Sequence, residues 1–190
     1  MKRNVNFFIL ELQRAFHLQP FLIAVVGIYT TMFLTIWQEL PYYREFDVLY
    51  AFQYARTEGF YLIFLLFAAI PHARTFANDF QSKAFRPLLI RAQSSLTYSI
   101  SKVASCFLSS GTAIVLAQIF VIFTLRLFCP LVDTSGASYL NMADNVLFGA
   151  AFRNGRYIVF FVYIIVLKAL GGAFLSVVAL VFSTYFSNGF

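Results

Sequence analysis

Apolar positions along this chain fall into long runs that are separated by short polar connections. Residues 18–37 and 103–125 carry no charged side chain, and residues 157–186 carry only Lys168. A helix needs roughly 20 apolar residues to cross about 30 Å of hydrocarbon, so each run predicts a membrane span. A fourth run, 59–71, is shorter and needs its flanks to complete a span. We therefore expect an all-α, polytopic membrane helix bundle within a single domain, residues 1–190, with spans at 18–37, 57–73, 103–126 and 157–186.

The segment before the first span, residues 2–17, has the periodicity of an amphipathic helix. Most of its apolar side chains fall within about 120° of a helical wheel, and its polar side chains lie largely elsewhere. Such a helix lies in the plane of the membrane interface. The connections 38–58 and 131–156 mix aromatic and charged residues, so each predicts a short helix at the outer interface. The apolar arc of the first segment consists of Val5, Phe8, Ile9, Leu12, Ala15 and Phe16.

The connection between the second and third spans, Arg74–Lys102, carries five basic residues and one acid. Short Lys- and Arg-rich loops stay on the cytoplasmic side of the membrane. This bias predicts a multi-pass protein of the plasma membrane with a cytoplasmic N-terminus. Because topology accounts for most of the formal charge of +6, the charge does not indicate a nucleic-acid partner. Contact of these basic groups with anionic membrane lipid is an alternative use of the same loop.

No motif in the sequence predicts an enzyme. The glycine-rich nucleotide-binding loop places a Gly before its Lys, but the four lysines follow Met1, Ser82, Ser101 and Leu167. The histidines are isolated, and no serine lies in a nucleophile elbow, so neither a metal site nor a hydrolytic site is expected. If the protein uses ATP and Mg²⁺, another polypeptide binds them.

The last apolar run contains two features that affect its packing and function. Lys168 lies within it, and an ionisable residue in a membrane is a candidate for a translocation path. A snorkelling side chain or a shifted helix is the structural alternative. Gly171–Gly172 is a candidate break in this helix. Small residues recur at helical spacing in its second half and predict close packing against another helix, of this chain or of a second copy: Ala169, Gly172, Ala173 and Ser176.

The loop also resembles the intracellular loop of ABC-2-type transporter permeases, the membrane subunits of ABC exporters. The resemblance rests on an acid, a Leu-Leu pair, a serine-containing turn and a Lys that opens the next span. The segment 2–17 is similar to the elbow helix of that family, and 180–188 to the inner end of its fourth span. Where the family has a Gly, this chain has Lys83-Ala84. The loop residues that carry the resemblance are Phe76, Asp79, Leu88, Leu89, Arg91, Ser94, Ser95, Tyr98 and Lys102.

The resemblance implies the first four of six spans, so that the chain is C-terminally incomplete, and a dimer with a second permease copy or paralogue. It also implies that the loop 74–102 forms a coupling helix for a separate ATP-binding cassette ATPase, the chain itself forming the translocation path. The alternative is a membrane protein without transport activity, such as an assembly or immunity factor. The residues expected to contact the ATPase are Asp79, Phe80, Lys83, Phe85, Arg86, Leu88, Leu89 and Arg91.

Overall fold

The computed structural model describes residues 2–39, 47–54, 61–71, 75, 78–79, 82–92, 94–135, 137–144 and 149–187. Every regular element within these ranges is an α-helix, as the sequence predicts. The helices are α1 (Lys2–Ala15), α2 (Leu18–Glu39), α3 (Val48–Tyr54), α4 (Tyr61–Ala69), α6 (Phe85–Ala92), α7 (Ser95–Arg126), α8 (Ala137–Ala143), α9 (Gly149–Arg153) and α10 (Tyr157–Ser187).

Three of these helices are long and apolar enough to cross a membrane, which makes this a multi-pass membrane protein. The three candidate spans are Leu18–Trp37, Ser95–Arg126 and Tyr157–Ser183. The third predicted span is longer than expected at its start, because α7 begins eight residues before 103. Ser94 caps it: its hydroxyl oxygen accepts a hydrogen bond from the backbone N–H of Thr97 at 3.0 Å.

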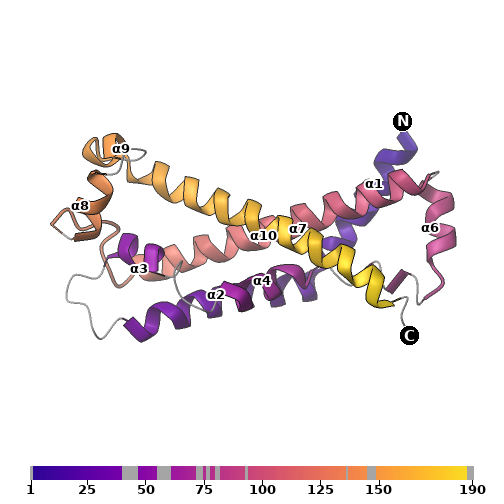
Figure 1. The fold of residues 1–190 in the computed structure, drawn as a ribbon, viewed down its shortest axis with the longest axis horizontal. Helices are drawn as coiled ribbons and strands as arrows, with labels where there is room; N and C mark the ends of the chain where they lie inside the picture. Colours follow the sequence, from indigo (N-terminus) through magenta and orange to yellow (C-terminus); the bar gives the residue numbers. More distant parts are fainter. Residues whose placement is uncertain are drawn as a thin grey trace.

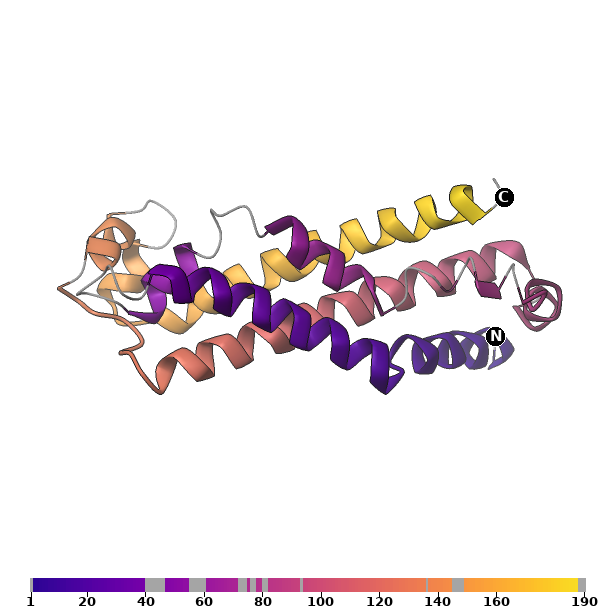
Figure 2. The same ribbon diagram turned by 90° about the horizontal axis from the view of Figure 1, so that it is seen from below.

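The long helices lie side by side and give the molecule two distinct ends (Figures 1 and 2). At one end lie α1, α6 and both termini of the chain; we call this the α6 end. At the other lie α3, α8 and α9, and we call this the α8 end. The connections predicted to be inner and outer are therefore at opposite ends of the bundle.

The second predicted span, 57–73, is represented in the described part of the chain by α4. A helix of nine residues is about 14 Å long, which is shorter than the hydrocarbon core. Residues 57–60 and 72–73 lie outside the described residues. Helix α4 packs closely on α2, because a Cβ atom at Gly27 would overlap the ring of Phe67. The glycine at this position thus lets an aromatic ring of α4 reach the α2 backbone.

Helices α7 and α10 form the main packing interface. The small residues of α10 face α7: the nearest atom to a Cβ built at Gly111 would be Ala173 Cβ, at 3.7 Å. The thiol of Cys106 donates to the carbonyl oxygen of Ser176 at 3.5 Å. Small side chains let the two backbones approach closely, as the stripe predicts. Helix α10 runs through Gly171 without a break.

At the α8 end, the described part of the first outer connection, α3, packs inward. Both Leu49 and Phe52 of α3 are fully buried in the core. Asp47 fixes the start of this helix, because its carboxylate accepts hydrogen bonds from the backbone N–H groups of Tyr50 (2.6 Å) and Asp133 (2.8 Å). Burial raises the pKa of the Asp47 carboxyl, and these two hydrogen bonds act in the opposite direction. Asp47 thereby joins α3 to the segment that follows α7.

Candidate functional site

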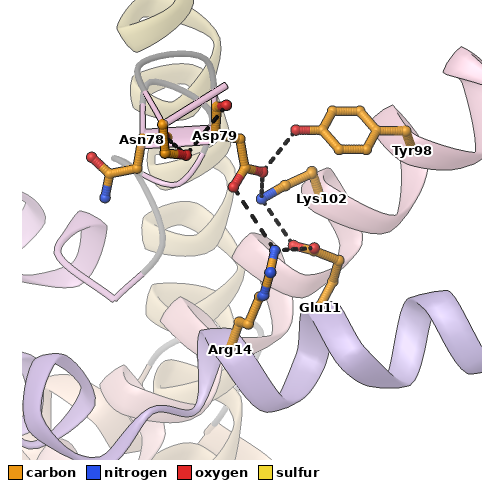
Figure 3. Close-up of polar contacts among 7 residues, drawn as sticks. Glu11, Arg14, Asn78, Asp79, Tyr98 and Lys102 are labelled. Atoms are coloured by element: carbon orange, nitrogen blue, oxygen red, sulfur yellow. Dashed lines mark hydrogen bonds and ion pairs between the residues drawn. The ribbon is translucent and has the colours of Figure 1, made fainter. Parts of the chain in front are cut away.

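A cluster of charged side chains joins three separate segments at the α6 end (Figure 3). Glu11 and Arg14 come from α1, Asp79 comes from the loop before α6, and Lys102 comes from α7. These segments are far apart in the sequence, and only the folded chain brings them together.

The ammonium group of Lys102 lies between two carboxylates. Its Nζ atom is 2.9 Å from Glu11 Oε2 and 2.6 Å from Asp79 Oδ2. Arg14 Nη1 closes the cluster from the outside, at 3.0 Å from Glu11 Oε1 and 3.8 Å from Asp79 Oδ1. The phenol of Tyr98 donates a hydrogen bond to Asp79 Oδ2 at 2.8 Å. Two acids and two bases therefore balance one another.

This cluster is shielded from solvent. The side chains of Glu11 and Lys102 are both 0% exposed, and that of Asp79 is 11% exposed. Charges in such surroundings interact strongly, but removing them from water is costly, so each must keep its partner. The ion pairs of the cluster join α1, the loop and α7.

One side of α1 packs against the rest of the chain. Phe7, Glu11 and Ala15 form a buried stripe at four-residue spacing. Phe7 packs against Tyr98, with ring centroids 6.0 Å apart, and belongs with Leu88 to a small apolar core. The predicted apolar arc shares Ala15 with this stripe and otherwise lies beside it, and Ile9 within the arc is exposed. One face of helix α1 therefore packs against the rest of the chain, and an adjacent apolar face is exposed.

The predicted coupling residues fall on different faces of α6 and its approach. Leu88 is only 4% exposed and contacts the chain's own helices, and Leu89 packs partly against the same core. Arg86 is exposed, and so is Ile90, at 75%. The open surface of α6 is thus formed by residues other than the Leu-Leu pair.

The other predicted loop residues occupy varied positions. Lys83 is exposed and has a positive φ of 57°. Arg91 is exposed and lines a small cavity beside α1. Phe85 begins α6, and Phe80 lies outside the described residues. Asp79 is occupied by the ionic cluster, so its carboxylate does not face an external partner.

Lys168 is buried near the α8 half of α10. It lies eleven residues, or about 16 Å, from the start of that helix, and is 8% exposed. Its Nζ atom is 4.5 Å from the centroid of the Phe52 ring, within the range of a cation–π interaction. Phe52 also packs edge-on against Phe161, with centroids 5.7 Å apart. Lys168 is therefore part of the contact between α10 and α3.

The cluster itself does not follow from the sequence pattern. Asp79, Tyr98 and Lys102 occur together in the family pattern, whereas Glu11 and Arg14 are not part of it. One signal was present: Glu11 and Asp79 are the only acids in two segments that are otherwise basic. A lone acid in such a segment, with a Lys at the mouth of an uncharged run, indicates a buried ion pair.

Within the ranges that the structure describes, no three His, Cys, Asp or Glu side chains come close enough to hold a metal ion. Comparison of the chain with protein-family models, with curated proteins and with solved structures finds no match. The function therefore has to be inferred from the residues and their geometry.

Proposed function

We propose that this chain is the membrane subunit of an ATP-driven ABC exporter, and that a separate ATPase docks on α6. In this proposal the α6 end is cytoplasmic, α1 is the elbow helix, and the protein sits in the plasma membrane as one permease of a dimer. Residues 57–73 form a further span, the second in chain order, beside the three candidate spans. The ATPase partner binds ATP and Mg²⁺, and the bundle provides the path for a substrate.

The position of α6 supports a docking role. It runs across the end of the bundle, outside the three candidate spans (Figure 1). Its inner face is anchored by Leu88, while Arg86 and Ile90 are open. An exposed apolar side chain beside a basic one can fill a pocket and pair with an acid on a partner.

The backbone at Lys83 also supports the family resemblance. The resemblance places a glycine in the turn before the coupling helix, where this chain has Lys83-Ala84. Lys83 adopts the left-handed conformation, with φ of 57°, which glycine enters without steric cost. The backbone here thus has the shape that a glycine would provide.

The observation that carries the proposal is the ionic cluster. Lys102 Nζ lies 2.6 Å from Asp79 Oδ2 of the loop. Lys102 is also the last charged residue of α7 before its uncharged stretch, 103–125. A displacement of α6 and its flanks by a partner would therefore be passed to α7 and α1. Helix α7 packs along α10, so the motion would reach the interior of the bundle.

Co-purification from native membranes tests this proposal. We expect an ATPase to co-purify with the chain in stoichiometric amount. The double variant Arg86→Glu, Ile90→Asp should release the ATPase and lower ATP turnover at least tenfold, which corresponds to a loss of about 1.4 kcal/mol of docking free energy. Arg156→Glu is the matched control, because Arg156 is an exposed basic residue at the α8 end. It should leave the ATPase bound.

A chain that purifies without an ATPase, or ATP turnover that is unchanged in the α6 variant, contradicts the exporter. Either result would favour the alternative of a membrane protein that binds its partners without transport.

A further inference from the structure

A cavity of about 170 Å³ lies where α1 meets α6. It is too small for a drug-sized ligand, whose pockets run from roughly 300 to 1,000 Å³. Its lining combines two chemistries. Phe7 and Leu10 make most of the lining apolar, and Arg91 and Asn6 are the lining residues that carry N–H groups. A site of this kind suits a small group that is anionic at one end and apolar at the other.

The charges around the cavity favour an anion. In the part of the chain that the structure describes, the guanidinium of Arg91 has no carboxylate within ion-pair distance. The two acids at this end, Glu11 and Asp79, are already held by Lys102 and Arg14. No acid that the structure describes at this end is therefore left to repel an anion or to compete for Arg91.

The location of the cavity favours a lipid. Ile9 follows Asn6 of the cavity lining by three positions, so its exposed apolar side chain lies one helical turn along α1, and Phe16, Leu18 and Leu22 are exposed apolar side chains as well. Such a surface is typical of a helix at the boundary between headgroups and acyl chains. A phosphate at Arg91 would then have its acyl chains beside this surface.

We infer that the α1–α6 cavity binds the phosphate headgroup of an anionic phospholipid. Arg91 provides charge-assisted hydrogen bonds to the phosphate oxygens, and the amide of Asn6 provides a further donor. Leu10 and Phe7 contact the glycerol and the first part of an acyl chain. This site does not depend on the proposed ATPase, and it uses a different face of α6 from Arg86 and Ile90.

Native mass spectrometry of the purified full chain tests this inference. The chain is released from vesicles of mixed phosphatidylglycerol and phosphatidylcholine, and the ratio of the two lipids that remain bound is measured. We expect wild type to retain phosphatidylglycerol preferentially. Arg91→Gln should lower that preference about tenfold, the effect of losing one charge-assisted hydrogen bond.

Arg86→Gln is the matched control, because it removes the same charge from the same helix outside the cavity. It should keep the wild-type ratio. Asn6→Leu is a second test that leaves every charge in place, and it should also lower the ratio; circular dichroism confirms that each variant is folded. An equal loss in the Arg86 and Arg91 variants would show only general attraction to basic residues and overturn the site. Displacement of the lipid by excess inorganic phosphate would also overturn it, because the cavity would then be selecting free phosphate.

Discussion

Lys102 is the residue on which the ionic cluster depends. It is completely buried, and it is the only cation within ion-pair distance of both Glu11 Oε2 and Asp79 Oδ2 among the described side chains. Arg14 contacts the other oxygens of the same carboxylates, but it is 42% exposed and one of its distances is 3.8 Å. Lys102 and Arg14 are therefore not equivalent, and Lys102 contributes more to stabilising the two buried carboxylates.

At this scale we predict that Lys102→Met destabilises the protein by about 3 kcal/mol, because it leaves two buried carboxylates without their central cation. Equilibrium unfolding in mixed micelles measures the change, and Lys83→Met, at an exposed position, is the control. The triple variant Glu11→Gln, Asp79→Asn, Lys102→Met should recover most of the loss, since it removes the orphaned charges. A triple variant less stable than Lys102→Met alone would show that the loss comes from packing.

At the scale of elements, the packing of helices in this bundle is set by small residues at two different contacts. At Gly27 the ring of Phe67 occupies the space of a Cβ atom, whereas at Gly111 the nearest atom is at an ordinary van der Waals distance of 3.7 Å. The two glycines thus differ in how well their surroundings accommodate a larger side chain, and the sequence alone does not show this difference.

We therefore predict that Gly27→Ala destabilises the α2–α4 contact, by about 1–3 kcal/mol for an overpacked site. Gly111→Ala should be neutral or slightly stabilising, because Ala also has the higher helix propensity. Unfolding of the two variants in the same micelles gives the comparison. If both variants lose the same stability, the close approach of Phe67 to α2 is not the cause.

The sequence predicts the parts of the bundle that depend on local composition. Residues 18–37 and 157–186 become helices because a long apolar run has no other way to satisfy its backbone in lipid. Contacts that depend on distant residues were not predictable in the same way. Phe7 falls outside the apolar arc of the N-terminal wheel, yet it packs on Tyr98. Phe52 suggested a surface helix, yet it lies under Lys168. In each case the partner is decided by tertiary packing.

At the scale of the whole molecule, the two ends of the bundle differ in charge. The α6 end holds the basic loop and α1, whereas at the α8 end Asp47, Asp133 and Asp144 offset Arg126, Arg153 and Arg156. We predict that Lys83→Cys, in a background of Cys106→Ala and Cys129→Ala, reacts with a membrane-impermeant thiol reagent only after the membrane is opened. Thr134→Cys, at the exposed turn of the α8 end, should react in intact cells. Reaction of both from the same side would contradict this orientation.

The ionic cluster also sets an order of events during synthesis. Glu11 is made 91 residues before Lys102, counted from their sequence numbers. At about 5–20 residues per second, the buried face of α1 waits roughly 5–18 s for its partner to emerge. Until α6 and α7 are made, Phe7 and Glu11 have neither helix to cover them. The buried face of α1 is thus covered only once α7 is made, and the membrane surface must hold α1 until then.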